Sequence, residues 1–166
     1  FLTGKAGTGK TTFLKYITQT TTKRFVVLAP TGVAAINAGG STIHSFFQLP
    51  LCPYLPDVKE LITEYQMPER YRSLRKERIK IIRTLDLLII DDLGTEMPGQ
   101  FVTSALYNLV NDRLLAGRPM VISTNLNVME DLPKRYAPQV VSRLQGSFKL
   151  LPFVGEDIRV KKNWGL

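Results

Sequence analysis

The stretch that decides the fold is Gly4-Lys5-Ala6-Gly7-Thr8-Gly9-Lys10-Thr11, near the start of a chain of 166 residues. It has the pattern of a phosphate-binding loop, in which a glycine and four further residues precede Gly-Lys-Thr. The apolar pair Phe1-Leu2 precedes the loop, and the helix-like run Thr12-Phe13-Leu14-Lys15-Tyr16-Ile17 follows it. Strand, glycine loop and helix in this order are the context that supports the motif.

Each residue type in the loop has a chemical reason. Glycines let backbone N–H groups wrap around phosphate oxygens, and the helix N-terminus adds the positive end of its dipole. We expect Lys10 to reach the β- and γ-phosphates of ATP, and the Thr11 hydroxyl to hold Mg²⁺. The predicted nucleotide-binding residues of the loop are Gly4, Gly7, Thr8, Gly9, Lys10, Thr11 and Thr12.

The composition is that of a single globular domain, with 44% apolar and 22% charged residues. No apolar run approaches the ~20 residues that a membrane crossing needs, and no signal peptide is visible. The single Cys52 excludes an internal disulfide and is typical of a reducing compartment. We therefore expect a cytoplasmic protein, in the bacterial cytosol or at the nucleoid, with no membrane partner. Because the chain lacks an initiator Met and its first strand is short, we also expect an N-terminal truncation.

The chain has a formal net charge of +8, and seven basic residues lie beside two acidic ones between positions 66 and 83. A basic cluster of this size suits a polyanion such as single-stranded DNA. The same stretch carries apolar residues at near-helical spacing, so a solvated helix face explains the charge equally well.

Apolar strands alternate with helices along the chain. The spacing predicts strands at Phe25–Ala29, Leu85–Ile90, Pro119–Thr124 and Phe148–Phe153, helices at Gly9–Gln19, Gly32–Asn37, 57–66, 69–84, Gln100–Ala116 and Pro138–Leu144, and an extended proline-rich loop at 49–56. This alternation predicts an α/β fold with a mostly parallel sheet. We expect one P-loop NTPase domain over residues 1–166, a three-layer sandwich of the RecA-like or AAA+ type.

A second nucleotide-site signature is the apolar run Leu87-Leu88-Ile89-Ile90 that ends in Asp91-Asp92. Asp91 is placed to hold Mg²⁺ through water, and Asp92 to orient or deprotonate the attacking water. Many such enzymes have Glu at the second position, so the shorter Asp92 predicts slow catalysis. Glu96 is a weaker candidate for the same role. A solvated strand end is the alternative explanation.

Three further residues are candidates for the same site. Asn125 follows Ser123-Thr124 at the end of a predicted strand, where open parallel sheets bind ligands. We expect it to help place the water, although Asn also caps turns. An arginine near the γ-phosphate stabilises the charge that develops during transfer. Arg143 and Arg159 are the candidates, and ordinary surface positions would explain both equally well.

Residues 1–91 resemble the Pif-type DNA helicases of superfamily one. The matching residues are the loop, then Ala29-Pro30-Thr31-Gly32-Val33-Ala34-Ala35-Ile36-Asn37, then Gly40-Ser41-Thr42-Ile43-His44-Ser45-Phe46-Phe47. The resemblance implies that Thr31 and Gly32 approach a DNA phosphate and that Thr42, His44 and Phe46 line the path of a single strand. Aromatic and basic groups suit such a path, because bases stack and phosphates pair. Core packing of Phe46 and a satisfied buried His44 are the alternatives.

The helicase resemblance departs after Asp91. That family continues with Asp-Glu and then Ile-Ser-Met, whereas this chain has Asp91-Asp92-Leu93-Gly94-Thr95. No later Gly-Asp-x-x-Gln motif and no second motor domain are found in these 166 residues, so we expect that this chain alone does not act as a complete helicase.

Residues 85–163 are instead similar to bacterial helicase loaders of the DnaC and IstB type, which are AAA+ ATPases. The similarity rests on Leu88–Glu96, Ile122–Leu126, Ser142-Arg143-Leu144 and Gly155-Glu156-Asp157-Ile158-Arg159. It implies that Asn125 is a sensor, that Arg143 is a finger offered to a neighbouring subunit, and that Arg159 is a second sensor on the nucleotide. A replicative helicase or a second copy of the chain is then the partner.

The chain therefore has the sequence of a hybrid with a junction near 85–92. Our main prediction is a loader-like AAA+ ATPase that binds and hydrolyses ATP with Mg²⁺ in DNA replication or maintenance. The first alternative is the N-terminal motor domain of a Pif-type ATP-dependent DNA helicase. The second is an ATP-binding switch that barely hydrolyses its ligand.

Overall fold

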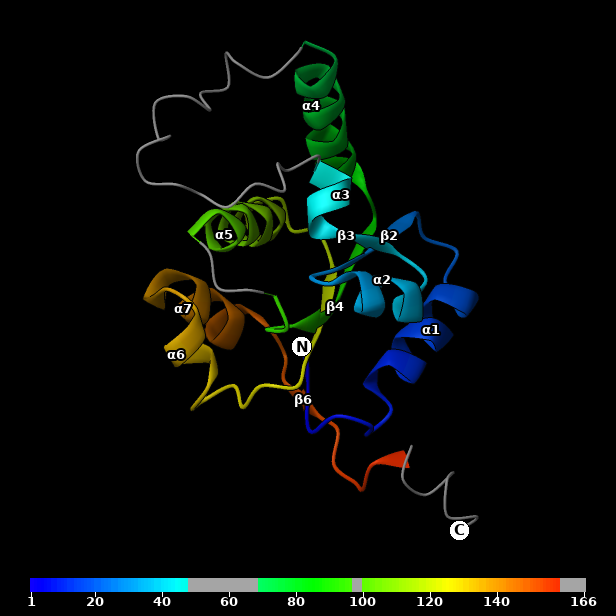
Figure 1. The fold of residues 1–166 in the computed structure, drawn as a ribbon, viewed down its shortest axis with the longest axis vertical. Helices are drawn as coiled ribbons and strands as arrows, with labels where there is room; N and C mark the ends of the chain where they lie inside the picture. Colours follow the sequence, from blue (N-terminus) through cyan, green and yellow to red (C-terminus); the bar gives the residue numbers. More distant parts are fainter. Residues whose placement is uncertain (48–68, 97–99, 159–166) are drawn as a thin grey trace.

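The structure, a computed structural model, describes residues 1–47, 69–96 and 100–158, with the backbone alone at 69–72, 74–75 and 100–105. Its strands are β1 (Leu2–Thr3), β2 (Phe25–Ala29), β3 (Ser41–Thr42), β4 (Leu87–Leu93), β5 (Met120–Thr124) and β6 (Leu151–Pro152). Its helices are α1 (Lys10–Thr20), α2 (Gly32–Ala38), α3 (Ile43–Phe47), α4 (Glu69–Thr84), α5 (Gln100–Leu115), α6 (Leu132–Arg135) and α7 (Pro138–Ser147) (Figure 1).

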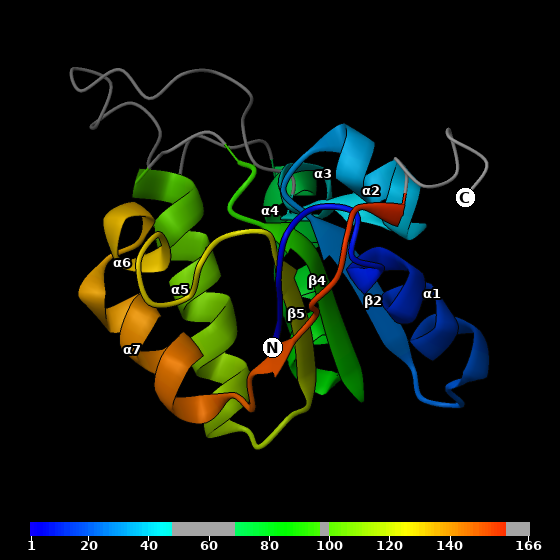
Figure 2. The same ribbon diagram turned by 90° about the horizontal axis from the view of Figure 1, so that it is seen from below.

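The six strands form one parallel sheet in the order β3-β2-β4-β5-β1-β6. Figure 2 shows α1 and α2 on one side of this sheet and α5, α6 and α7 on the other. The predicted α/β fold is confirmed, and the sheet is parallel throughout the described residues. Because the strands run in one direction, their carboxyl ends share one edge, where open α/β sheets bind ligands.

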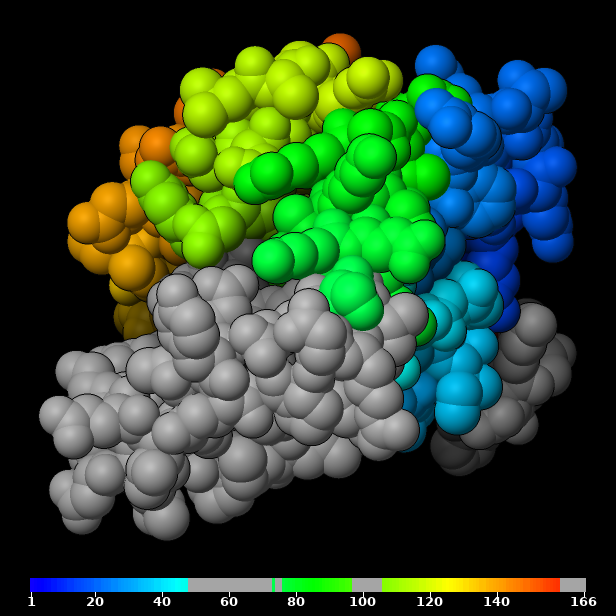
Figure 3. Space-filling view, turned by 90° about the horizontal axis from the view of Figure 1, so that it is seen from above, coloured from blue at the N-terminus to red at the C-terminus, as the bar shows by residue number. Residues whose placement is uncertain are grey.

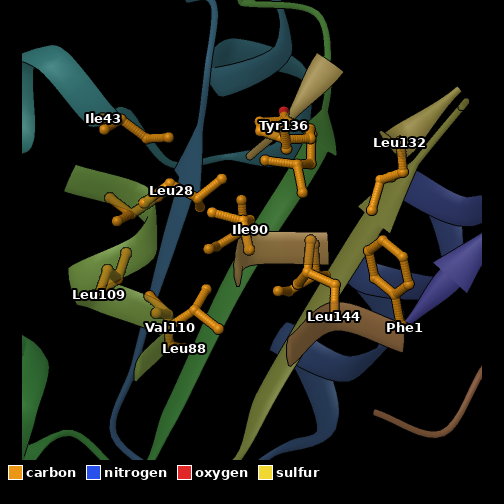
Figure 4. Close-up of a cluster of buried hydrophobic side chains, with 14 of the residues drawn as sticks. Phe1, Leu28, Ile43, Leu88, Ile90, Leu109, Val110, Leu132, Tyr136 and Leu144 are labelled. Atoms are coloured by element: carbon orange, nitrogen blue, oxygen red, sulfur yellow. The ribbon is translucent and has the colours of Figure 1, made fainter. Parts of the chain in front are cut away.

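The central strands are buried on both faces because their side chains alternate. In β4, Leu88 and Ile90 join the larger core cluster, while Leu87 and Ile89 join the smaller one under α1. Figure 4 shows the larger cluster, in which Leu28, Leu88 and Ile90 from the strands meet Leu109 and Val110 of α5 and Leu144 of α7. A period of two over an apolar run produces this division.

Most predicted elements are found with small shifts in their bounds. Helix α4 and strand β2 begin and end at the predicted residues. Strand β4 starts two residues later than predicted, because the Leu85 N–H donates to the Ile81 carbonyl and extends the α4 turn. The last strand is limited to Leu151–Pro152. The short elements β3, α3 and α6 were not predicted. The predicted helix at 57–66 and loop at 49–56 lie outside the described residues.

A buried arginine fastens the end of α4 to the sheet. Arg113 of α5 is fully buried and donates to the carbonyl oxygens of Ile82 (2.6 Å), Leu85 (3.1 Å) and Pro119 (2.7 Å). The last carbonyls of a helix lack partners within the helix, so an arginine there satisfies them. Burial lowers the pKa of Arg113 from its ordinary value. The contacts fix where β4 begins and hence where its acidic end lies.

Candidate nucleotide-binding site

The loop between β1 and α1 has the geometry of a phosphate-binding loop. Lys10 opens α1, is 6% exposed, and its Nζ donates to the carbonyl oxygens of Gly4 and Lys5, both at 2.7 Å. The ammonium group therefore lies folded over the loop, where phosphate oxygens would lie. Gly9 caps α1 at a φ of 94°, a backbone conformation that glycine adopts without strain.

The last described segment of the chain packs against this loop. The Ile158 N–H donates to the Gly7 carbonyl at 3.0 Å, and the Phe153 N–H donates to the Thr3 carbonyl at 2.7 Å. Gly7 has a φ of 76°, and a Cβ added there would overlap the Asp157 carboxylate. Only glycine suits this position, both for its backbone conformation and for the room that Asp157 takes.

Two groups predicted to hold a metal ion are in contact. The Thr11 hydroxyl donates to the Asp91 carboxylate, at 3.1 Å to Oδ2 and 3.4 Å to Oδ1. Asp91 is 2% exposed and follows four buried apolar residues of β4. A hydroxyl beside a carboxylate is a donor set that Mg²⁺ accepts, since Mg²⁺ takes one or two protein oxygens and keeps waters and substrate phosphates as its other ligands.

The second acid is held by the end of β5. The Asn125 Nδ2 donates to Asp92 Oδ1 at 2.6 Å, and the Ser123 hydroxyl donates to Asp91 Oδ1 at 2.5 Å. The backbone N–H of Asp92 in turn donates to the Ser123 hydroxyl oxygen at 2.9 Å. The structure therefore brings together both predicted acids and Asn125, and it adds Ser123 between them.

One cleft of about 240 Å³ joins these groups. It is lined by Gly7, Gly9, Lys10, Thr11, Thr12, Ala34, Asn37, Asp91, Asp92, Ser123, Asn125 and Ile158. The predicted loop residues Gly4 and Thr8 do not line this cleft; they line a second pocket, together with Asn125, Leu126 and Phe153. The cleft lies where the loop with α1, helix α2, the ends of β4 and β5, and the segment after β6 meet, with Lys10 on one side and the two acids on the other.

Four residues that line the cleft were not predicted as site residues from the sequence. Ser123 was quoted only as the neighbour of Asn125, although a hydroxyl at the end of a buried strand is itself a signal for such a site. Asn37 and Ala34 come from α2, and Ile158 comes from the segment after β6. No local pattern places these three, because the packing of distant segments brings them to the cleft.

Arg143 is not among the residues that line the cleft. It lies on α7, where its Nε donates to Asn111 Oδ1 at 2.8 Å and its guanidinium lies 4.7 Å from the centre of the Tyr107 ring. It thus fastens α7 to α5, and within this chain it takes no part in the nucleotide site. Arg159, the other predicted arginine, lies outside the described residues.

Glu96 does not replace Asp92, which corrects the weaker candidate for the catalytic acid. Its carboxylate is 7% exposed, accepts the Gly94 N–H at 2.8 Å and the Tyr136 hydroxyl, and lies 3.9 Å from Arg135. Burial and then the neighbouring Glu96 charge raise the pKa of Tyr136 well above its ordinary value. Glu96 therefore stabilises the turn after β4, and it is not among the residues that line the cleft.

The predicted DNA-contact residues follow strands β2 and β3 at the same edge of the sheet. Thr31 caps α2 by accepting the Ala34 N–H at 3.3 Å, and Gly32 is the first residue of that helix. Thr42 ends β3 and accepts the Ser45 N–H at 3.0 Å. His44 is half-buried in α3. The structure therefore places these four on one side of the molecule without testing their role.

Phe46 and part of the basic stretch are already engaged within the chain. Phe46 is half-buried against the larger core cluster, and the Arg78 guanidinium lies 5.4 Å from the centre of its ring and donates to its carbonyl at 2.8 Å. Arg83 pairs with Asp112 of α5 at 2.7 Å. Figure 3 shows the green surface of α4 between the lime surface of α5 and the cyan surface of α3. Lys76 and Lys80 are exposed on α4.

The fold is shared with an AAA+ protein. The AMPPCP-bound DnaA from Aquifex aeolicus superposes on all of this chain and 44% of its own, with a TM-score of 0.62 and 16% sequence identity. At this identity the likeness shows the fold alone. The comparisons give no specific support to the predicted relationship with the DnaC and IstB loaders, so the loader-like prediction is not upheld.

Similarity in both sequence and structure leads instead to the helicases. The ATP-dependent DNA helicase Pif1 of Campylobacter jejuni is 26% identical over 117 residues, which are 69% of this chain and 24% of that protein. The crystal structure of Bacteroides Pif1 bound to ssDNA superposes on 93% of this chain and 38% of its own, with a TM-score of 0.58 and 28% identity. The chain thus spans about a quarter of the length of the curated relatives it matches. Residues 1–93 match the family model described as PIF1-like helicase, and the chain belongs to this family.

Proposed function

We propose that this chain binds and hydrolyses ATP as one P-loop domain, and that it is the N-terminal motor domain of a Pif1-type DNA helicase. The observation that carries the proposal is the meeting of Lys10, Thr11, Asp91, Asp92 and Asn125 around one cleft. The membership in the PIF1-like family supports the choice of a helicase. The structure of Bacteroides Pif1 in complex with ADP-AlF4 supports the choice of nucleotide, since that protein is 27% identical over 93% of this chain.

The residues of the cleft have separate roles in the reaction. Backbone N–H groups of the loop and the α1 N-terminus hold the phosphates, and Lys10 exchanges its two carbonyl acceptors for phosphate oxygens. Asp92 accepts a proton from the attacking water, with Asn125 fixing the direction of its carboxylate. General-base catalysis of this kind contributes about 10²- to 10⁴-fold to a rate.

Mg²⁺ fits the residues at the acidic end of the cleft. Thr11 and Asp91 would hold it, and their contact at 3.1 Å shows that both oxygens reach one place. Within the described residues no group of three or more His, Cys, Asp or Glu side chains could hold a metal ion. A site with so few protein ligands suits a cation that keeps its waters and neutralises phosphate charge.

Single-stranded DNA is the proposed polymer partner. Bacteroides Pif1 has been solved bound to ssDNA. In this chain Thr31, Gly32, Thr42 and His44 lie at the end of the sheet where β2 and β3 stop. Among the described residues of the basic stretch, Lys76 and Lys80 are exposed on α4. No helix of the described residues is long and apolar enough to cross a membrane.

The deciding experiment is ATP turnover per chain as a function of protein concentration, with and without single-stranded DNA. We expect turnover that is independent of protein concentration and stimulated by DNA, because the described catalytic groups all come from one chain. Turnover that rises with protein concentration would contradict a self-contained motor domain and would assign Arg143 to a neighbouring site. ATP binding without turnover would contradict hydrolysis and favour a nucleotide-dependent switch.

The DNA proposal has its own test. Binding of a labelled single strand should weaken as salt is raised, because cations released from the DNA drive the association. Thr31→Ala should weaken this binding at every salt concentration without changing ATP affinity. Thr18→Ala, at a half-buried position of α1, is the control. Affinity that does not respond to salt would contradict the proposal.

A further inference from the structure

The two acids of the cleft lie on a β-bulge. In the pairing of β4 with β5, Ile90 lies opposite Ile122 and Leu93 lies opposite Thr124. Two residues of β4, Asp91 and Asp92, therefore face a single residue of β5, Ser123. Such an extra residue interrupts the ladder and redirects side chains, and bulges are common beside active sites.

The bulge allows two consecutive acidic residues to line the same cleft. In a regular strand, neighbouring side chains point to opposite faces of the sheet, so one of two adjacent carboxylates would be directed away from the cleft. Here both Asp91 and Asp92 line the cleft. Asp92 achieves this with a φ of 60°, the only positive φ of a non-glycine residue within the described part of the chain. Asp and Asn are the side chains that adopt this conformation most readily after glycine.

Ser123 is bonded to both sides of this bulge. Its hydroxyl oxygen accepts the Asp92 N–H at 2.9 Å, and its hydroxyl hydrogen goes to Asp91 Oδ1 at 2.5 Å. Ser123 is 1% exposed although it borders the cleft, so its two hydrogen bonds are largely shielded from water. Without the hydroxyl, a buried backbone N–H and a buried carboxylate oxygen would each lose a partner, which is costly inside a protein.

We propose that Ser123 is a positioning residue for ATP hydrolysis: its hydroxyl fastens the β4 bulge and so holds the metal-binding Asp91 and the water-activating Asp92 in the cleft together. The inference rests on the proposed function for the roles of the two acids. It also explains why Asp at position 92 is compatible with this site, since the left-handed backbone that the bulge imposes is poorly suited to Glu.

The first measurement is amide hydrogen exchange at Asp92, followed by NMR in the nucleotide-free protein. We expect Ser123→Ala to raise exchange at Asp92 at least tenfold, because that N–H loses its acceptor. Asn125→Ala removes a side-chain contact to the same residue and should leave the Asp92 amide protected. Unchanged exchange in Ser123→Ala would overturn the proposal whether or not the protein hydrolyses ATP.

The second measurement compares kcat and ATP affinity between the parent and the Ser123 variants. We expect Ser123→Ala to lower kcat at least tenfold while ATP affinity changes less than threefold, and Ser123→Thr to restore kcat to within about threefold. Thr124→Val is the matched control, because Thr124 is also fully buried and its hydroxyl donates to the Leu93 carbonyl at 2.6 Å without touching an acid. Its kcat should stay within twofold of the parent.

The outcomes separate the inference from the function beneath it. A parent protein that neither binds nor hydrolyses ATP would contradict the proposed function, and the exchange measurement would still decide the role of Ser123. A parent that hydrolyses ATP with Ser123→Ala equally active would contradict the inference alone. Equal losses of kcat in Ser123→Ala and Thr124→Val would reduce Ser123 to a general contributor to stability and would also overturn it.

Discussion

The two sides of the cleft are built on different kinds of backbone. On the loop side, the groups come from one stretch of chain, and Lys10 donates to carbonyls five and six residues away. On the acidic side, Asp91, Asp92, Ser123 and Asn125 are joined by side-chain hydrogen bonds that span 31 to 33 residues. The loop side should therefore depend on its own residues, whereas the acidic side should depend on how β4 and β5 are aligned.

The largest expected effect is on the loop side. Lys10→Ala should abolish measurable ATP binding, because it removes the buried cation that faces the phosphates. A charge-assisted contact of this kind, lost at a desolvated site, corresponds to a weakening of about 100-fold or more. Titration with a fluorescent ATP analogue checks this. Lys5→Ala, an exposed lysine of the same loop, should bind as the parent does. ATP affinity that is unchanged in Lys10→Ala would remove the basis of the proposed function.

The next effect separates the acidic side from binding. Asp92→Asn keeps the shape of the side chain and tolerates the same backbone conformation, but it cannot accept a proton from water. We expect kcat to fall by about 10²- to 10⁴-fold while ATP affinity changes little. Asp86→Asn, an exposed carboxylate just before β4 that pairs with Arg24, should keep its turnover. An equally large loss in both variants would mean that charge near β4 matters and not the position of Asp92.

A smaller effect tests whether the stability of the phosphate-binding loop depends only on its own residues or also on the packing of Asp157. Gly7→Ala forces a side chain onto a left-handed backbone and into the Asp157 carboxylate. Gly117→Ala meets only the first problem, since its φ is 61° and nothing lies within 4 Å. We expect losses of unfolding free energy of about 2–3 kcal/mol and about 1 kcal/mol, respectively, by urea titration.

The double variant Gly7→Ala with Asp157→Ala sharpens this test. Removing the carboxylate should return part of the stability that Gly7→Ala loses, leaving a deficit close to that of Gly117→Ala. If the double variant is as unstable as the sum of the single variants, Asp157 does not restrict position 7, and the packing of the last described segment on the loop has no energetic weight.

The same contrast explains what the sequence revealed. The loop, its flanking helix and the order Asp91-Asp92 are contiguous patterns, and the structure brings Lys10, Thr11 and both acids to one cleft. The bulge between β4 and β5 depends on the register of strands that lie about 30 residues apart, and no local pattern encodes it. Elements of two to five residues, such as β3, α3 and α6, are too short to show a period. The loader resemblance rested on short motifs in the second half of the chain, and it finds no specific support.

Roles were harder to predict than positions. Arg143 sits in a motif-like context, yet its contacts are to Asn111 and Tyr107 on α5. Glu96 follows the two acids closely, yet its partners are Gly94, Tyr136 and Arg135. Glu96 is therefore part of the packing of the turn after β4, whereas the role of Arg143 at a neighbouring subunit stays a prediction. The identity of a partner on a distant element decides this, and the sequence alone does not show it.

The smallest expected effect concerns Tyr136, which is linked to the acidic side of the cleft through Glu96. The Tyr136 hydroxyl donates to Glu96, whose carboxylate also holds the Gly94 N–H two residues after Asp92. Burial and the Glu96 charge raise the pKa of Tyr136 above its ordinary value of about 10. The folded protein therefore keeps this proton at a pH where the unfolded chain loses it. The resulting stability is fully present below pH about 10 and is lost as the pH rises above it.

Tyr136→Phe should remove this dependence on pH. We expect the variant to lose about 1 kcal/mol of unfolding free energy at pH 8, because Glu96 loses a donor. Between pH 8 and 10.5 the parent should lose more stability than the variant, as followed by urea unfolding. Equal slopes in the two proteins would contradict the coupling of Tyr136 to Glu96. If kcat also falls severalfold in Tyr136→Phe at pH 8, the acidic side of the cleft depends on the contact between Tyr136 and Glu96 as well as on Ser123. This result would strengthen the contrast with the loop side, which depends on its own residues.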